Sequence, residues 1–232
     1  IDVSVGIVSY GNESDIINNI ESLLCNTDKK RVNLSIYIVN NHPHDKLTKA
    51  RKMYENRIVF IDSDKNGGYG YGHNRVLLNE LQSKYHLILN PDVTFTEDTI
   101  SKLVDILESD NDKKIAVVTP QILNSDGTIQ YIPRRYPRFI YILSSSFGFL
   151  DRFRAEYTME GDLPTEVSEI DICTGAFMFM RTDLFTKVGG FDEDYFMYFE
   201  DFDLSLRLSK YGSIIFNPDT KVTHYWHRNS KK

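Results

Sequence analysis

The chain has 232 residues, of which 41% are hydrophobic and 12% aromatic, so it can bury a core and is too apolar for a disordered segment. Its net charge of −6 argues against a nucleic-acid partner, and no apolar run approaches the roughly 20 residues of a membrane-spanning helix. Two cysteines, Cys25 and Cys173, suggest neither a disulfide framework nor a cysteine-rich zinc site, and a reducing cytoplasm is expected. The first residues lack the features of a signal peptide. Because the sequence starts without Met, we expect a trimmed or truncated form of a longer chain.

Strand and helix patterns alternate through the first half of the chain. β-branched and apolar runs predict strands at 3–9, 35–39, 58–61, 85–89 and 115–119. Helical spacing of apolar residues predicts helices around 16–24, 47–53, 76–81 and 100–107. This order predicts an α/β fold, a mostly parallel sheet with helices on both faces. Ligands bind such sheets at the carboxyl ends of the strands, where Asn40, Asp62, Asp92 and Pro120 are expected.

The second half is less regular. Residues 132–139 carry Arg134, Arg135 and Arg138, and an apolar stretch, FIYILSSSFGFL, follows. A further strand is predicted at 174–180 and a helix that begins near Asp201. With no internal repeat and no low-complexity linker, the simplest interpretation is one domain over 1–232.

A glycine cluster, NGGYGYGHN, spans residues 66–74. It matches neither the dinucleotide-binding pattern nor a P-loop. Four glycines in six residues permit a backbone to approach a ligand closely, and they also suit a loop that needs positive φ angles. The residues alone leave both interpretations open.

Asp92 follows a predicted strand in the stretch LILNPDV. Pro91 ends the strand, and an Asp in such a place is more often a turn or capping residue. The alternative is a metal ligand, because Mg²⁺ or Mn²⁺ is often held by one or two carboxylates together with substrate phosphates.

The densest acidic region is GGFDEDYFMYFEDFDLSLRL, residues 189–208. A solvated acidic face is the usual interpretation, but the aromatic residues before Glu200 and Asp201 indicate a packed wall. An ionised Asp201 at a helix N-terminus at the edge of a pocket suits a general base. In the tail, His224 and His227 lie in a predicted extended segment and point in opposite directions, so at most one is expected to bind metal.

The seven motifs VSVGIVSYG, IVNN, NGGYGYGHN, LILNPDV, TGAFMFMR, GFDEDYFMYFEDFDLSLRL and HYWH occur in an order that resembles family-2 glycosyltransferases with a GT-A fold. The resemblance covers essentially the whole chain and is strongest to bacterial O-antigen and polysaccharide rhamnosyltransferases. It implies transfer of L-rhamnose from dTDP-β-L-rhamnose, with inversion, to a GlcNAc on undecaprenyl diphosphate. It also implies that residues 1–120 bind mainly the nucleotide sugar and that 121–232 are mainly the acceptor-binding and catalytic half.

The same resemblance implies roles for single residues. Asp92 is implied to be the metal-binding acid of a degenerate DxD motif, in which Asn90 takes the first position. His224, near the end of the chain, is implied to bind the metal or the diphosphate. Asp201 becomes the catalytic base, and Glu200 helps to orient it or the acceptor. The residues implied to line the nucleotide sugar are Tyr10, Asn40, Gly67, Gly68, Gly70, Asn74 and Asn90. Asn40 stands where the family usually has Asp, which puts the base preference in question, and His227 replaces a common glycine and receives no role.

The arginines at 134, 135 and 138, with Arg152 and Arg154, flank the apolar stretch and suit anionic lipid headgroups or the acceptor diphosphate. An ordinary helix with solvated arginines is the alternative. From the first of these interpretations we expect peripheral contact with the inner face of the bacterial plasma membrane. Two rival functions stay open: the same chemistry with UDP-galactose or UDP-GlcNAc, and a non-catalytic sugar-nucleotide or glycan-binding module. A dinucleotide-dependent oxidoreductase fits worst, because the glycine pattern differs.

Overall fold

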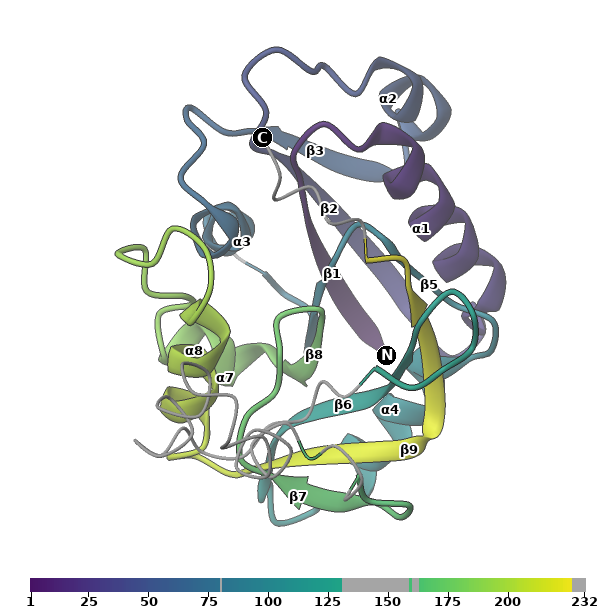
Figure 1. The fold of residues 1–232 in the computed structure, drawn as a ribbon, viewed down its shortest axis with the longest axis vertical. Coiled ribbons are helices and arrows are strands. Elements are labelled where there is room, and N and C mark those ends of the chain that lie inside the picture. Colours follow the sequence, from purple (N-terminus) through teal and green to yellow (C-terminus); the bar gives the residue numbers. More distant parts are fainter. Residues whose placement is uncertain (80, 131–158, 160–162, 227–232) are drawn as a thin grey trace, which may run out of the picture.

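The computed structural model describes residues 1–79, 81–130, 159 and 163–226 (Figure 1). The first half contains β1 (Asp2–Ser9), α1 (Glu13–Asn26), β2 (Asn33–Asn40), α2 (Thr48–Tyr54), β3 (Ile58–Asp62), α3 (Tyr69–Leu77), β4 (Tyr85–Leu89), β5 (Val93–Thr94), α4 (Thr99–Ser109) and β6 (Ile115–Leu123). The second half contains β7 (Ser168–Ile170), β8 (Phe177–Arg181), α7 (Thr182–Lys187), α8 (Glu200–Leu208) and β9 (Ser213–His224). The predicted basic stretch around Arg134, Arg135 and Arg138 lies outside the described residues.

The strands form one sheet in the order β3-β2-β1-β4-β8-β6-β9-β5, with β7 paired to β9. The four strands from β3 to β4 are parallel, as the alternating pattern predicts. The sheet beyond β4 is mixed, and four of the neighbouring pairs among the described strands are parallel and four antiparallel. The sheet is therefore mixed, and the predicted parallel pairing is found from β3 to β4 and again between β6 and β9. β8 runs antiparallel to β4, so that Phe177 at the start of β8 pairs with Leu89 at the end of β4.

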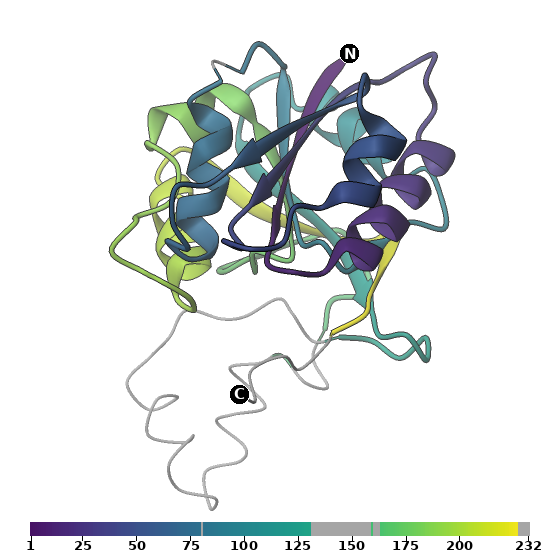
Figure 2. The same ribbon diagram turned by 90° about the horizontal axis from the view of Figure 1, so that it is seen from above.

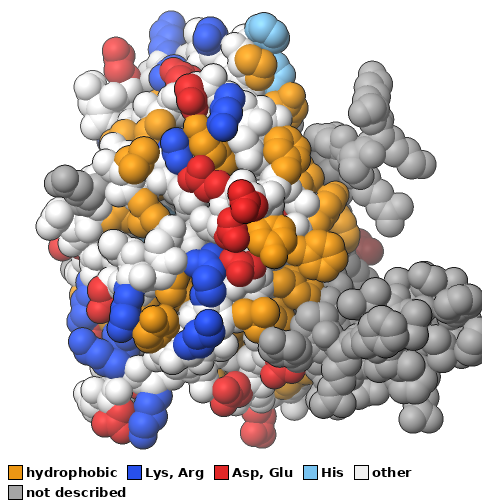
Figure 3. Space-filling view, turned by 90° about the vertical axis from the view of Figure 1, so that its left-hand side faces the viewer, with side chains coloured by type: hydrophobic (Ala, Val, Ile, Leu, Met, Phe, Trp, Pro, Cys, Tyr) orange, Lys and Arg blue, Asp and Glu red, His pale blue; other side chains and the backbone are white. Residues whose placement is uncertain are grey.

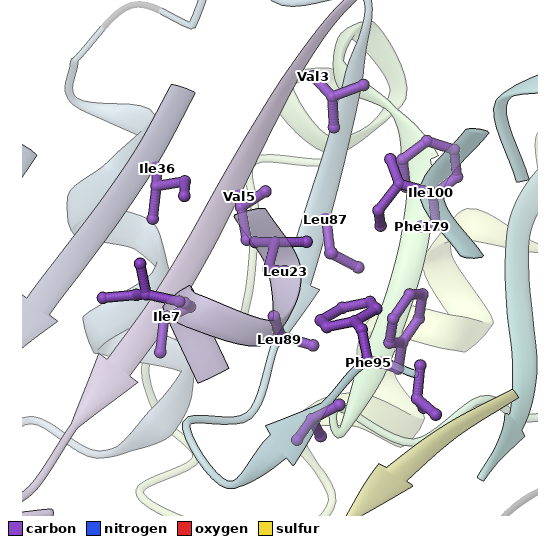
Figure 4. Close-up of a cluster of buried hydrophobic side chains, with 14 of the residues drawn as sticks. Val3, Val5, Ile7, Leu23, Ile36, Leu87, Leu89, Phe95, Ile100 and Phe179 are labelled. Carbon is purple, nitrogen blue, oxygen red and sulfur yellow. The ribbon is translucent and has the colours of Figure 1, made fainter. Parts of the chain in front are cut away.

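Helices cover both faces of the sheet, as predicted (Figure 2). Val3, Val5 and Ile7 of β1 point into the core shared with α1, α2 and α4. Figure 4 shows this core, in which Leu23 of α1 and Ile100 of α4 meet side chains of the central strands. The opposite face packs against α3, α7 and α8 through two further apolar clusters. Period-two alternation along the strands separates the two cores.

The carboxyl ends of the parallel strands lie at one edge. Ser9 pairs with Asn40, Asn40 with Asp62 and Ile7 with Leu89. Asn40, Asp62 and the LNPD turn therefore share this edge, as predicted. Pro120 instead lies within β6, at a register irregularity between Pro120 and Gln121, where a missing N–H is tolerated.

Two element boundaries differ from the sequence prediction. α3 begins at Tyr69, so Gly70 and Gly72 lie inside the helix rather than in a preceding turn. His224, in the predicted extended tail, is the last residue of a longer strand, β9, which starts at Ser213, while His227 lies outside the described residues. Both cysteines are free, in agreement with the prediction of no disulfide framework.

Candidate active site

Asp92 and His224 form a close pair at the edge of the sheet. The short strand β5 runs antiparallel to β9 and sets Val93 opposite His224, so that Asp92 reaches the imidazole. Asp92 Oδ1 lies 3.1 Å from His224 Nε2, with His224 buried and Asp92 half-buried. The turn itself is closed without the Asp92 side chain: Val93 N donates to Asn90 O, and the buried Asn19 amide donates to the carbonyls of Asn90 and Val93. This arrangement favours a ligand role for Asp92 over a capping role.

Two amide side chains surround the same imidazole. Asn90 Nδ2 lies 3.2 Å from His224 Nε2, and Gln130 Oε1 lies 2.9 Å from His224 Nδ1. Asn90 and Asp92, which the resemblance places in one motif, therefore both lie beside the His224 ring. Gln130 is missing from the sequence prediction, because nothing in the local pattern distinguishes it from a turn glutamine.

Asp201 lies in the first turn of α8, and its carboxylate is oriented by two backbone groups. Gly175 N donates to Asp201 Oδ2 at 3.0 Å, and Phe202 N donates to Oδ1 at 2.9 Å. Gly175 belongs to the TGAFMFMR motif, so this bond joins two distant motifs. A carboxylate held in this way keeps lone pairs for a proton from a substrate hydroxyl.

Glu200, next to it, is buried, and its Oε2 has no hydrogen-bond partner among the described residues. Burial raises the pKa of Glu200 to about 7, and the charge of Asp201 adds to this rise. Two adjacent carboxyl groups thus differ sharply in environment, which is typical of functional sites.

Tyr69 contacts the backbone of Gly175, whose amide holds Asp201. Its hydroxyl donates to the carbonyl of Gly175 at 2.6 Å. Burial raises the pKa of the Tyr69 phenol well above its usual value, and the negative charges of Glu200, Asp201 and Asp92 raise it further. Tyr69 is therefore within electrostatic reach of all three acids. Sequence analysis gives Tyr69 no role, since an aromatic residue between glycines is ordinarily a packing residue.

The glycine cluster packs closely against the segment that leads to Glu200. Tyr69 N donates to Phe196 O at 3.1 Å, and a Cβ on Gly68 would lie 1.8 Å from that oxygen. Gly68 also has a φ of +95°, and a Cβ on Gly70 would lie 2.7 Å from Phe191 Cβ. The positive φ of Gly68 agrees with the interpretation as a loop, and the close approach that the structure shows is to the protein's own chain. Contact of Gly67, Gly68 and Gly70 with a nucleotide stays a prediction.

The segment 195–199 exposes five consecutive large side chains, Tyr195, Phe196, Met197, Tyr198 and Phe199. Figure 3 looks onto this side of the molecule, where hydrophobic side chains gather beside charged ones. Tyr198 and Phe199 have φ angles of +70° and +69°, which are uncommon for aromatic residues. Such strain directly before Glu200 is typical of a functional segment.

The residues expected to bind the nucleotide lie at or near the same edge, with their polar groups largely engaged. Tyr10 is exposed and packs against His42. Asn40 is buried and donates to Asp45 O at 2.7 Å and to Asp62 Oδ1 at 3.0 Å, so an Asp in its place would face a second carboxylate. The buried Asn74 exchanges hydrogen bonds with the backbone of Phe191. Their nucleotide contacts stay predictions, and the observed bonds give Asn40 and Asn74 structural roles.

The donor atoms near Asp92 suit a divalent cation. One carboxylate oxygen and one imidazole nitrogen converge within 3.1 Å, and this pair of ligand types is compatible with Mn²⁺. Within the described ranges, no three His, Cys, Asp or Glu side chains gather into a complete metal site. A cation held there needs further oxygen ligands, which a diphosphate can supply.

Comparison with known proteins gives a consistent family. Residues 4–189 match the model of glycosyl transferase family 2. Rhamnosyltransferase WbbL of Escherichia coli (strain K12) is 29% identical over 99% of this chain and 85% of its own length. The N-acetylglucosaminyl-diphospho-decaprenol L-rhamnosyltransferase of Mycobacterium tuberculosis (strain H37Rv) is 27% identical over 83% of this chain and 66% of its own. The crystal structure of GalNAc-T7 with UDP, GalNAc and Mn²⁺ superposes with a TM-score of 0.71 at 15% identity, over 98% of this chain and 44% of that one.

Proposed function

This chain belongs to glycosyl transferase family 2 and is a glycosyltransferase, and we propose that it transfers L-rhamnose from dTDP-β-L-rhamnose to a GlcNAc carried on a polyprenyl diphosphate. The names of the two bacterial relatives support rhamnose as the sugar, and the mycobacterial name supports a lipid-diphosphate GlcNAc as the acceptor. The observation that carries the proposal is the carboxylate of Asp201, held by the amides of Gly175 and Phe202 beside the buried Glu200.

In the proposed reaction the acceptor hydroxyl attacks the anomeric carbon from the face opposite the leaving diphosphate. Asp201 accepts the proton of that hydroxyl, and the amides of Gly175 and Phe202 hold its carboxylate in position. Glu200 keeps a proton to a higher pH than an exposed Glu and orients the acceptor by hydrogen bonding. A proton donor for the leaving group is not needed, because the nucleoside diphosphate departs as an anion.

Asp92 and His224 are proposed to hold Mg²⁺ or Mn²⁺ together with the donor diphosphate. When bound, the cation supplies Lewis-acid stabilisation of the leaving diphosphate. The GalNAc-T7 structure, which was solved with UDP and Mn²⁺, supports a divalent cation as the cofactor. Asn90 lies beside His224, and a second carboxylate is not required there, because the donor diphosphate supplies further oxygen ligands.

Because the proposed acceptor is anchored in lipid, the transfer reaction is expected to take place at a membrane surface. Within the part of the chain that the structure describes, no helix has the length and hydrophobicity needed to cross a bilayer. We propose peripheral contact with the cytoplasmic face of the plasma membrane through the arginines near 134–138. Flotation with anionic liposomes tests this: the wild-type chain is expected to float, and its absence from the lipid fraction would count against membrane contact.

The donor is tested by turnover with a panel of dTDP-β-L-rhamnose, UDP-galactose and UDP-GlcNAc, using a synthetic GlcNAc-diphosphate-lipid acceptor and Mn²⁺. The proposal predicts product with dTDP-β-L-rhamnose and an inverted anomeric centre. Preference for a UDP-sugar would overturn the donor assignment while keeping the chemistry. Binding of a nucleotide sugar without turnover of any would support the non-catalytic alternative.

A further inference from the structure

The imidazole of His224 has a defined orientation that depends on Gln130, a residue that belongs to none of the family-like motifs. Gln130 is buried, and its side chain makes two contacts with the same histidine residue. Its Nε2 donates to the backbone carbonyl of His224 at 3.2 Å, and its Oε1 lies 2.9 Å from Nδ1 of the ring.

These two contacts fix the direction of the amide. If the amide were turned over, its oxygen would face the carbonyl oxygen of His224, and two acceptors would meet. In the observed direction Gln130 Oε1 can only accept, so that Nδ1 of His224 must carry the proton. A neutral ring then has its lone pair on Nε2.

That lone pair faces the place where a cation is expected. Nε2 lies 3.1 Å from Asp92 Oδ1, which is also an acceptor, and 3.2 Å from Asn90 Nδ2, which can donate to it. Two acceptors so close together are stabilised by a cation between or beside them. Before a cation binds, the Asn90 amide can donate a hydrogen bond to Nε2.

We propose that Gln130 is a positioning residue that locks His224 in the tautomer protonated on Nδ1 and so prepares Nε2 to bind the divalent cation. This rests on the proposed metal site, and it adds a residue from outside the motifs. Outer hydrogen bonds of this kind fix the tautomer of metal-binding histidines, and their loss typically weakens metal binding by about 10–100-fold.

The first test is the tautomer of His224 in the metal-free protein, measured by long-range proton–nitrogen correlation NMR at about pH 8. The His224→Ala variant identifies the signal among the six histidines. The wild-type ring is expected to be protonated on Nδ1 only. The Gln130→Met variant, which keeps the length but loses both contacts, should show a mixture of tautomers. A ring protonated on Nε2, or on both nitrogens, in the wild type would overturn the proposal, as would an unchanged tautomer in Gln130→Met.

The second test is Mn²⁺ binding in the presence of dTDP, followed by the loss of the free-ion electron paramagnetic resonance signal. Gln130→Met is expected to bind Mn²⁺ about tenfold more weakly or worse. Gln130→Glu keeps an acceptor oxygen beside Nδ1 but loses the donor to the His224 carbonyl, so it should retain the tautomer and bind Mn²⁺ more tightly than Gln130→Met does. Equal losses in the two variants would indicate a packing role only. Because the tautomer is read without donor or metal, this test can succeed even if the proposed donor is wrong.

Discussion

Replacement of Gly68 by Ala should disrupt the link between the glycine cluster and the segment that precedes the candidate base. Gly68 has φ and ψ of +95° and −175°, a region that is essentially restricted to glycine, and strain there costs of order 1–3 kcal/mol. The added Cβ would lie 1.8 Å from Phe196 O and 2.6 Å from Phe196 C, so the backbone of Phe196 must move. Overpacking of this kind costs about 1–3 kcal/mol more. The total expected loss of unfolding free energy is roughly 2–6 kcal/mol.

Gly127→Ala is the matched control. Gly127 also has a positive φ, +82°, but a Cβ there meets no atom of the described residues within 4 Å. It should cost only the strain of a left-handed alanine, about 1–2 kcal/mol. Urea unfolding measures both losses. Turnover should fall by up to about a hundredfold in Gly68→Ala, because Phe196 and Glu200 share one segment, and stay near wild type in Gly127→Ala. Equal stability and equal turnover of the two variants would mean that the close contact between Gly68 and Phe196 matters for neither property.

Three further predictions concern charge. Because folding raises the pKa of Glu200 from 4.5 to about 7, stability should fall as pH rises through that window, by up to about 1.4 kcal/mol per pH unit. Glu200→Gln should therefore be the more stable protein at pH 8 in urea unfolding, and a less stable variant would contradict this. Burial lowers the pKa of His86 from 6.5 to about 3, and it lowers the pKa of His73 as well. Below pH 6.5 the unfolded chain therefore binds more protons than the folded protein, and the free energy of unfolding falls as the pH falls. Unfolding free energy measured between pH 6.5 and 4.5 should decline less steeply in His86→Leu, and an unchanged slope would count against this origin. Asn90→Asp adds a carboxylate beside Asp92 and His224 and should tighten Mn²⁺ binding in calorimetry; weaker binding would argue against a cation at this place.

The parallel half of the fold is readable from the sequence because local patterns determine it. Apolar runs such as 85–89 alternate with helical stripes, and β1 leads through α1 to its neighbour β2, as β2 does through α2 to β3. The mixed half depends on long-range pairing. β8 lies between β4 and β6, and β9 pairs with both β5 and β6, relations that no local pattern encodes.

The candidate site shows the same division. Asp201 stands out as an acid at a predicted helix start, and the resemblance to the family adds Asp92 and Glu200. Their partners do not stand out, since the amide of Gly175 and the side chain of Gln130 become relevant only once the sheet brings them to Asp201 and His224. Asn74 illustrates the converse, because its motif suggests a ligand contact while its amide binds the backbone of Phe191.

Turnover of dTDP-β-L-rhamnose by Asp201→Asn tests whether Asp201 removes the acceptor proton during sugar transfer. The assay uses the GlcNAc-diphosphate-lipid acceptor with Mn²⁺, and the exposed Asp194→Asn serves as the matched control. We predict that Asp201→Asn binds the donor normally in calorimetry and loses about a hundredfold or more of its turnover, while Asp194→Asn keeps it. Turnover by Asp201→Asn close to that of the wild type would mean that Asp201 is not the catalytic base.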